Sequence, residues 1–363
     1  MTSTRAVHVP GKTNLPSKTN EKSETSRTNE TSRTNETSRA SRSKGSGTRP
    51  SGPALGAGRR TLRAVALAAT VPYLVLKSAW LSGSRVGIPE GSPLQEPGMF
   101  LTLANAVTLA MDACVILLVL ALTRPWGMRL PPWLLTVPAF VATGLLTPIL
   151  TAFPAQLLIR AAGSGARAPA EGAVRPFLDS WVFTVVYTGF TVQGLALAGL
   201  FVPYARERWG RRWQGVQGRG LPSPTGVVAG AAAVCGVLVA GVHVYWALGG
   251  AGGMGAERAA ARSAMTGVVS GVHAMCALAA AAGALLLARG GSRRVWWPLA
   301  LTWTGSAAAL CWGLWPLIAS LGTQLDGGEH PSGTVRLIYA GQMITGVLAA
   351  AVLARFLTSR REA

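Results

Sequence analysis

The chain has 363 residues, of which 49% are hydrophobic and only 13% are charged, and its mean hydropathy is positive. Soluble proteins carry about 25% charged residues, so this composition indicates a chain that spans a membrane. The formal net charge of +20 is spread over a polar tail and over loops between apolar runs. That distribution excludes a single folded basic face for nucleic acid.

Residues 1–60 form a polar N-terminal tail with 12 Lys and Arg against 4 Glu, and the hexad Thr28–Arg33 is repeated as Thr34–Arg39. Such a segment buries too little apolar surface to offset its chain entropy, so we expect it to be disordered. Two interpretations are open: a tether to anionic lipid of the inner leaflet, or a solvated leader without a partner. The second is favoured.

From Leu62 onward, apolar runs of about 20 to 25 residues alternate with short polar loops. This is the length that a helix needs to cross roughly 30 Å of hydrocarbon. We therefore predict an all-α fold, a polytopic transmembrane bundle of eight spans. The predicted spans lie at about 62–82, 100–123, 132–154, 180–204, 225–248, 264–288, 296–320 and 334–357.

The charge of the loops orients these spans. Loops after even-numbered spans, together with the carboxyl end, are rich in Arg, whereas the opposite loops are close to neutral. By the positive-inside rule the Arg-rich side is cytoplasmic, which places both termini inside. Trp residues gather near the predicted span ends, and only Trp303 and Trp312 lie well inside a span. The first span follows Arg59 and Arg60 directly and is interpreted as an uncleaved signal anchor, consistent with the plasma membrane. The Arg, Ala and Gly content is typical of a bacterium.

The first four spans resemble the last four. Trp80 and the following glycine correspond to Trp246 and its glycine, and Tyr187 of a Tyr-x-Gly segment corresponds to Tyr339. Because each half has an even number of spans, both halves enter the membrane in the same sense, and the repeat is parallel. A ligand path is then expected at the seam between the halves. The predicted division is a first half at 61–204, a basic cytoplasmic loop at 205–223 and a second half at 224–363.

The segment Tyr245–Gly250, with His243 three residues before its Trp, has the form Trp-x-Leu-Gly-Gly. It resembles a pattern that recurs in uncharacterised eight-span integral membrane proteins of actinobacteria. The copy around Trp80 departs from the double glycine, with Ser82 and Ser84 in its place. The resemblance covers the eight spans and excludes the tail. It implies a membrane fold and brings no activity, cofactor or catalytic residue.

Motifs of soluble enzymes are missing from the sequence: we find no P-loop, no GxGxxG between a strand and a helix, no HExxH and no GxSxG. We therefore expect no enzyme, and no cofactor or metal site. The four Cys lie singly in apolar runs and are interpreted as core residues. A haem held by His243 and His273 is disfavoured, because the two differ in depth by about five residues, roughly 7 Å along a helix axis.

Polar groups inside the spans are the remaining candidates for a functional site. Asp112 and His273 lie about ten to twelve residues from the outer ends of equivalent spans, near the midplane at 1.5 Å per residue. A carboxylate at that depth costs several kcal/mol unless it is paired, protonated or hydrated, and His273 is the nearest candidate partner. Gln193 lies at a similar depth. Lys77 and His243, equivalent in the repeat, lie nearer the outer face and are secondary candidates. Alternatively, Asp112 only fixes the packing of helices.

Small residues are abundant in the fifth and sixth spans. Gly226-x-x-x-Gly230 and the run Ala279–Gly283 predict close backbone packing at the centre of the bundle. Helices of this kind bury most of their surface in protein, which places His273 in the interior.

Two functions fit these features. The first is a permease-like protein that moves a small solute or a proton along a polar seam near Asp112, Gln193 and His273. The alternative is a non-catalytic membrane scaffold or sensor that contacts a partner through the basic tail and the loop at 206–219. A membrane-embedded enzyme ranks third.

Overall fold

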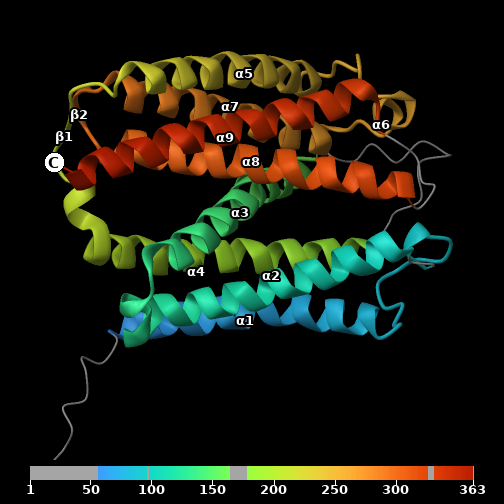
Figure 1. Ribbon diagram of the computed structural model, residues 1–363. Helices are drawn as coiled ribbons and strands as arrows, with labels where there is room; N and C mark the ends of the chain where they lie inside the picture. The colour runs from blue at the N-terminus through green and yellow to red at the C-terminus, as the bar shows by residue number, and fades with distance from the viewer. Residues whose placement is uncertain (1–55, 96–97, 164–177, 326–330, 363) are drawn as a thin grey trace, which may run out of the picture. The chain divides into compact units, whose positions relative to one another are not determined.

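The computed structural model describes residues 56–95, 98–163, 178–325 and 331–362, which belong to one compact unit. The predicted tail lies outside these residues except for its last few positions, which already form part of the first helix. The long helices are α1 (Ala57–Leu81), α2 (Met99–Thr123), α3 (Pro132–Ala161), α4 (Ser180–Trp213), α5 (Ser223–Ala247), α7 (Ala264–Arg289), α8 (Trp296–Leu325) and α9 (Gly333–Glu362) (Figure 1).

Seven of the described helices are long and apolar enough to cross a membrane, namely α1, α2, α3, α4, α5, α7 and α9. The chain is thus a multi-pass integral membrane protein with an all-α fold. The predicted seventh span is also a 30-residue helix, α8, but it does not belong to this set. It packs against α3, α7 and α9, and it buries Thr302 and Ser306 among alanines. A helix enclosed by protein needs fewer apolar side chains than one that faces lipid.

Consecutive long helices run in opposite directions, so their connections alternate between two ends of the bundle (Figure 1). One end carries the antiparallel strands β1 (Val216–Gly218) and β2 (Gly291–Arg294), together with the end of α9 and the 3-10 turn η2 (Pro125–Arg129). The two strands belong to separate connections, α4–α5 and α7–α8, and pair with each other as in a hairpin, so we call this the hairpin end. The opposite end carries the short helix α6 (Ala256–Ala260) and the turn η1 (Pro93–Gln95), and we call it the α6 end.

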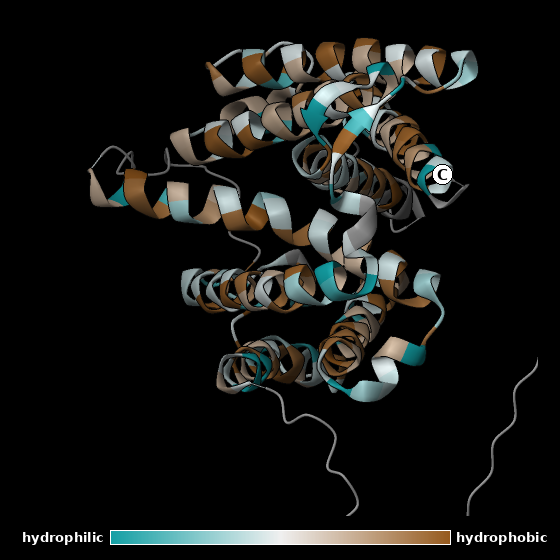
Figure 2. Cartoon of the chain, turned by 90° about the vertical axis from the view of Figure 1, so that its left-hand side faces the viewer, coloured by the Kyte–Doolittle hydropathy of each residue, from teal (hydrophilic) through white to brown (hydrophobic). Residues whose placement is uncertain are grey.

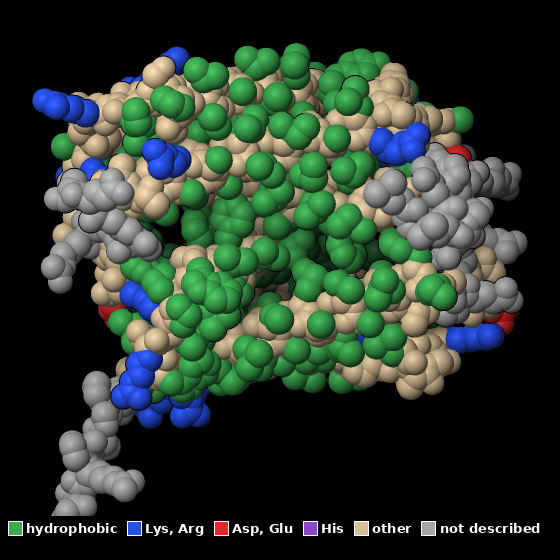
Figure 3. All heavy atoms as spheres, viewed as in Figure 1, with side chains coloured by type: hydrophobic (Ala, Val, Ile, Leu, Met, Phe, Trp, Pro, Cys, Tyr) green, Lys and Arg blue, Asp and Glu red, His purple; other side chains and the backbone are tan. Residues whose placement is uncertain are grey.

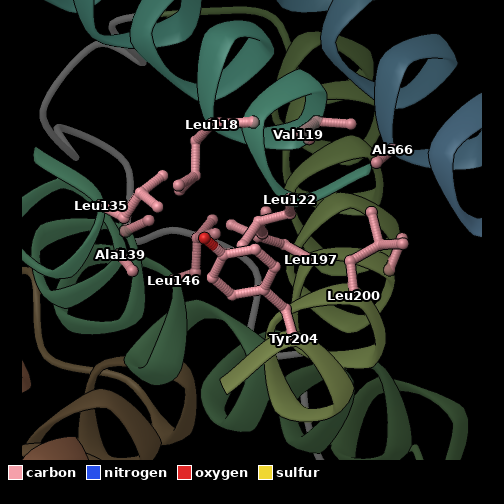
Figure 4. Close-up of a cluster of buried hydrophobic side chains, with 13 residues drawn as sticks. Ala66, Leu118, Val119, Leu122, Leu135, Ala139, Leu146, Leu197, Leu200 and Tyr204 are labelled. Carbon is pink, nitrogen blue, oxygen red and sulfur yellow. The ribbon is translucent and has the colours of Figure 1, made fainter. Parts of the chain in front are cut away.

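The helices form two groups of four that meet along α3 and α8. In the first group α1 packs on α2 and α4, and α4 packs on α3. In the second group α7 packs on α5 and α8, and α9 packs on α5 and α8. The apolar core of the first group draws on all four of its helices and includes Ala66, Leu118, Val119, Leu122, Leu135, Ala139, Leu146, Leu197, Leu200 and Tyr204 (Figure 4).

The outer surface of the bundle has the polarity expected of a protein in a bilayer. Large apolar side chains such as Leu103, Val227 and Leu337 are exposed along the helices. Hydrophobic side chains cover the middle of the face in Figure 3, which is hollowed between the two groups, and Lys and Arg lie toward the ends. Seen from the hairpin end, hydrophilic residues gather in the two strands (Figure 2).

Small residues bring α5 and α7 together, but not through Gly226 and Gly230, whereas Gly283 of the predicted run packs closely against Thr302 of α8. A Cβ added at Gly236 would meet the Ala281 side chain at 2.9 Å and the Ala277 carbonyl at 3.0 Å. Nothing lies within 4 Å of such an atom at Gly226 or Gly230. The prediction that this pair packs closely is wrong, because α5 lies at the edge of its group and only one of its faces is covered.

The two groups approach each other closely at Gly144 of α3. A Cβ there would overlap the Ala307 carbonyl of α8 and lie 2.6 Å from Cys311 Sγ. Only a residue without a side chain allows this contact.

We predict that Gly144→Ala lowers the free energy of unfolding by about 1–3 kcal/mol, because the added methyl group must push α3 away from α8. Thermal unfolding of the purified protein in detergent measures this change. The matched control is Gly230→Ala, which should be neutral or stabilising by up to about 1 kcal/mol, since Ala favours the helix. Equal effects of the two substitutions would contradict the prediction.

Candidate functional site

A cavity of about 290 Å³ lies between the two groups of helices, toward the α6 end. Four helices line it, two from each group, so it sits on the seam where a ligand path was expected. We call it the seam cavity. Its lining residues are Pro148, Ile149, Ala152, Phe153, Gln156 and Arg160 from α3, Phe183, Thr184 and Tyr187 from α4, Val269 and His273 from α7, and Trp312 from α8.

Aromatic rings form much of the cavity wall. Tyr187 stacks on Phe153, with ring centroids 5.8 Å apart, and lies 6.1 Å from the ring of Phe183. On the opposite side, the ring of Trp312 lies 5.4 Å from that of His273. The cavity therefore offers flat apolar surfaces from both groups of helices, which suit a planar or apolar ligand.

Proline residues shape the α3 side of the cavity. Pro148 lines the cavity inside α3, and because it has no backbone N–H, it leaves the carbonyl of Gly144 without its usual helical bond. The indole Nε1–H of Trp312 donates to the adjacent carbonyl of Leu145, with a distance of 3.2 Å between the two atoms. This bond from α8 ties the two groups together where α3 is weakened.

The polar side chains of the described cavity lining include one cation and no anion. Gln156 Nε2 donates to the Met265 carbonyl at 3.0 Å, which joins α3 to α7 and leaves its Oε1 as an acceptor. Arg160 is exposed in the last turn of α3, at the cavity mouth. None of the twelve lining residues is acidic. The described lining thus carries a cation without a carboxylate.

His273 lies in a buried polar cluster that reaches the cavity. Its Nδ1 is 3.1 Å from Gln342 Nε2, and its ring centroid is 5.3 Å from that of His243. Because the amide of Gln342 donates, Nδ1 is the acceptor, and the proton of a neutral ring is assigned to Nε2. Neither ring nitrogen of His243 has a hydrogen-bond partner of good geometry among the described residues, and the side chain with which His243 interacts is that of Gln342.

Gln342 is a site residue that the sequence analysis missed. It follows Gly341 of the Tyr-x-Gly segment that helped to define the repeat, and it is a buried amide inside an apolar run. That was the same signal that singled out Gln193, so the residue could have been found by its type. Its pairing with His273 depends on how α9 is rotated, which the sequence does not give.

Asp112 and Gln193 lie in the first group of helices, away from the seam cavity. Lys77 Nζ donates to Asn105 Oδ1 at 2.5 Å, which sets the register of α1 against α2. Helices α1 and α2 are antiparallel (Figure 1). Asp112 lies two turns after Asn105 on α2, and it is therefore level with Thr70, which lies two turns before Lys77 on α1. Asp112 and Lys77 interact electrostatically, so the charged neighbour of Asp112 is Lys77 and not His273.

Three buried polar atoms of this group have no hydrogen-bond partner among the described residues, and one of them, Arg59 Nε, belongs to the first turn of α1 at the hairpin end. Asp112 Oδ2 and Gln193 Nε2 are both buried and have no hydrogen bond to any described residue. A Cβ at Gly189 of α4 would lie 3.1 Å from the Ala69 carbonyl, so Gln193, one turn deeper, is about one turn below Thr70. Asp112 and Gln193 therefore lie at nearby depths, where α1, α2 and α4 meet.

The segment around Trp246 forms a corner at the end of α5, and the segment around Trp80 forms an equivalent corner at the end of α1. Trp246 Nε1 donates to the Gly252 carbonyl at 3.0 Å, and Trp80 Nε1 donates to the Val86 carbonyl at 2.9 Å. The two bonds have the same spacing along the chain. Lys77 Nζ lies 5.0 Å from the centroid of Trp80, and the ring of His243 lies 5.3 Å from that of Trp246.

A glycine with positive φ closes each of these corners. Gly83 has a φ of 90° and Gly249 a φ of 100°, and each N–H donates to the carbonyl of the Trp three residues earlier. This conformation ends a helix and favours glycine. The motif that carried the resemblance is therefore a structural corner at the α6 end.

Comparison with models of protein families, with curated proteins and with solved structures finds no match for this chain. Within the part of the chain that the structure describes, no group of three or more His, Cys, Asp or Glu is placed to hold a metal ion. A function must therefore be argued from the geometry of the seam cavity and of the buried polar clusters.

We predict a positive coupling between Lys77 and Asp112 in the stability of the protein. Lys77→Met alone leaves a buried carboxylate without its cation, whereas in an Asp112→Asn background the same change removes no charge partner. Thermal unfolding of the four proteins of this cycle should give a coupling energy larger than about 0.3–0.5 kcal/mol, the range within which distant, independent sites are additive. The control cycle combines Lys77→Met with Gln342→Leu, a residue of the other group, and should be additive. Additivity in both cycles would contradict the pairing.

Proposed function

We propose that this protein is a permease-like membrane protein that binds a small solute in the seam cavity and passes it between its two groups of helices, without converting it chemically. The observation that carries the proposal is the position of the cavity, inside a membrane-spanning bundle and lined by helices of both groups. Ligand sites of helical bundles commonly lie between helices in this way.

The inner part of the seam supports this function. Trp303 of α8 packs against Phe140 of α3 and Phe201 of α4, with ring centroids 5.1 Å and 5.9 Å away, and its Nε1 donates to Thr143 Oγ1 at 3.2 Å. It contacts the apolar clusters of both groups. The seam is therefore hollow toward the α6 end and filled toward the hairpin end, which fits one state of an alternating-access protein.

We propose further that α8 is the eighth span and that the chain is a parallel four-plus-four repeat. The repeat matches α1 with α5, α2 with α7, α3 with α8 and α4 with α9. Under this matching, every substantial helix contact inside the first group has its counterpart inside the second. The shared corners at Trp80 and Trp246 give the same correspondence.

Contacts across the seam follow the same symmetry. The pairs α3–α8 and α4–α9 each map onto themselves, and the pair α3–α7 maps onto α2–α8. This is the pattern of a two-fold axis along the helices, near α3 and α8. It supports a solute path on that axis, between the matched helices of the two groups.

We propose that the hairpin end is cytoplasmic and that the protein resides in the plasma membrane of a bacterium. Arg residues gather at this end, as the positive-inside rule requires. An eighth crossing by α8 would put both termini on this side. The described Arg residues at the hairpin end include Arg59, Arg60, Arg63, Arg124, Arg129, Arg206, Arg208, Arg219, Arg289, Arg293, Arg294, Arg355 and Arg360.

A second candidate is a sensor that binds the same solute without moving it. It is favoured by the separation of Asp112 and Gln193 from the seam cavity, because a polar path across the membrane would use such groups. A sensor and a permease share the cavity, and they differ in whether solute crosses the bilayer.

The orientation can be tested with single cysteines in a background in which the four native Cys are replaced by Ala. We predict that Ser82→Cys and Ala260→Cys, both exposed at the α6 end, react with an impermeant thiol reagent in intact cells. Ser292→Cys, exposed in β2, should react only after the cells are opened. Labelling of Ser292→Cys in sealed cells would overturn the orientation.

Transport can be tested with the protein in liposomes, incubated with a defined mixture of organic acids, amines and sugars. We expect at least one solute to accumulate inside, measured by mass spectrometry, and Ala152→Trp or Ile149→Trp to abolish this because each fills the cavity. The matched control is Val234→Trp on the lipid-facing side of α5, which should transport normally. Binding without accumulation would favour the sensor, and neither binding nor accumulation would overturn the proposal.

A further inference from the structure

From the chemistry of the seam cavity we infer its substrate class: a small aromatic carboxylate that carries a hydrogen-bond acceptor, such as a hydroxyl group, at the end opposite the acid. This inference rests on the proposed function, because it names the solute for the same cavity. Three features of the lining support it: walls made of aromatic side chains, a cation at the mouth, and a hydrogen-bond donor at the inner end.

The walls select the body of the ligand. Phe153, Phe183 and Tyr187 face the cavity from one group of helices and Trp312 from the other. Rings of this kind bind a flat ligand by stacking and edge contacts, which add about 0.5–1.5 kcal/mol for each ring pair. The volume of about 290 Å³ is at the low end for ligand pockets, so the body is one or two fused rings with short substituents.

Arg160 selects the charge of the ligand. Its guanidinium lies at the mouth, none of the described residues that line the cavity is acidic, and no described residue forms an ion pair with it. A carboxylate entering the cavity can therefore form a charge-assisted bond with Arg160 at the mouth. A cationic ligand would meet the guanidinium without any carboxylate to balance it.

His273 can donate a hydrogen bond to the end of the ligand opposite its acid. Gln342 occupies its Nδ1, which leaves the Nε2–H of the neutral ring as the donor available on the cavity side. A hydroxyl or carbonyl oxygen on the ligand can accept this bond. The two polar contacts lie at opposite ends of the cavity, so the ligand needs an acid at one end and an acceptor at the other.

Three probes separate these features: 2-naphthoate, 6-hydroxy-2-naphthoate and the neutral 2-naphthalenemethanol. Binding to the full chain in lipid nanodiscs is measured by quenching of Trp fluorescence. We expect both acids to bind more tightly than the alcohol, and the hydroxy acid to bind most tightly. Arg160→Gln should weaken binding of the acids about tenfold, which corresponds to 1.4 kcal/mol, and should change binding of the alcohol by less than about twofold.

The matched control is Arg336→Gln, another Arg at the α6 end that does not line the cavity, and it should leave all three affinities unchanged. His273→Phe keeps an aromatic ring and should abolish the advantage of the hydroxy acid over 2-naphthoate. Thermal unfolding of each variant checks that it is folded.

Equal affinities for acid and alcohol, or equal losses from Arg160→Gln and Arg336→Gln, would overturn the assignment of an anionic ligand. If no probe binds the wild type, the substrate class is wrong. Accumulation of a different solute in liposomes would then leave the proposed function standing, whereas no accumulation of any solute would remove both.

Discussion

The close approach of α3 and α8 is the contact on which the rest of the seam depends. Gly144 lets the α3 backbone touch the Ala307 carbonyl, and Trp312 bonds the Leu145 carbonyl just above it. On the other side of this contact, Trp303 fills the space between the two apolar cores. The cavity and the filled part of the seam therefore lie on either side of one glycine contact, and both exist only while α3 and α8 stay together.

Each group of helices also isolates its own polar side chains from lipid. In the first group these groups lie where α1, α2 and α4 meet, and they include Asp112 and Gln193. In the second group they lie where the matching helices α5, α7 and α9 meet, and they include His243, His273 and Gln342. Since a polar group in hydrocarbon is costly, burial between three helices is the arrangement available to both groups.

The sequence predicted the membrane-spanning helices well because the thickness of the bilayer sets the length of an apolar run. It predicted their ends less well. Helix α1 begins at Ala57, and α4 continues to Trp213, because a helix can extend beyond the hydrocarbon through polar residues that hydropathy does not mark. The eighth span and the repeat stay predictions, although α8 is a helix of sufficient length.

The candidate site could be predicted only by residue type and depth. Asp112 and His273 have similar depths, yet they belong to different groups of helices, and depth says nothing about which helices are neighbours. The rotation of each helix about its axis, 100° per residue, decides which side chains meet. This is why Gln342 was missed as the partner of His273, and why Gly226 and Gly230 were wrongly expected to pack closely.

The chain segment that joins α4 of the first group to α5 of the second also has a mechanical consequence. At the hairpin end of α4, Tyr204 and Arg208 bond the Gly127 carbonyl of the first group, and Trp209 packs on the core of that group.

A few residues later the chain is held by the second group. Trp213 packs on the second core, Arg360 of α9 bonds the Gln214 carbonyl, and Val295 bonds the Gly215 carbonyl. Between these anchors lies a single helical turn that contains Gly210, where a Cβ would meet no described atom within 4 Å. Any rocking of one group against the other must bend the chain within this one turn, so the linker acts as a short, stiff pivot and not as a slack tether.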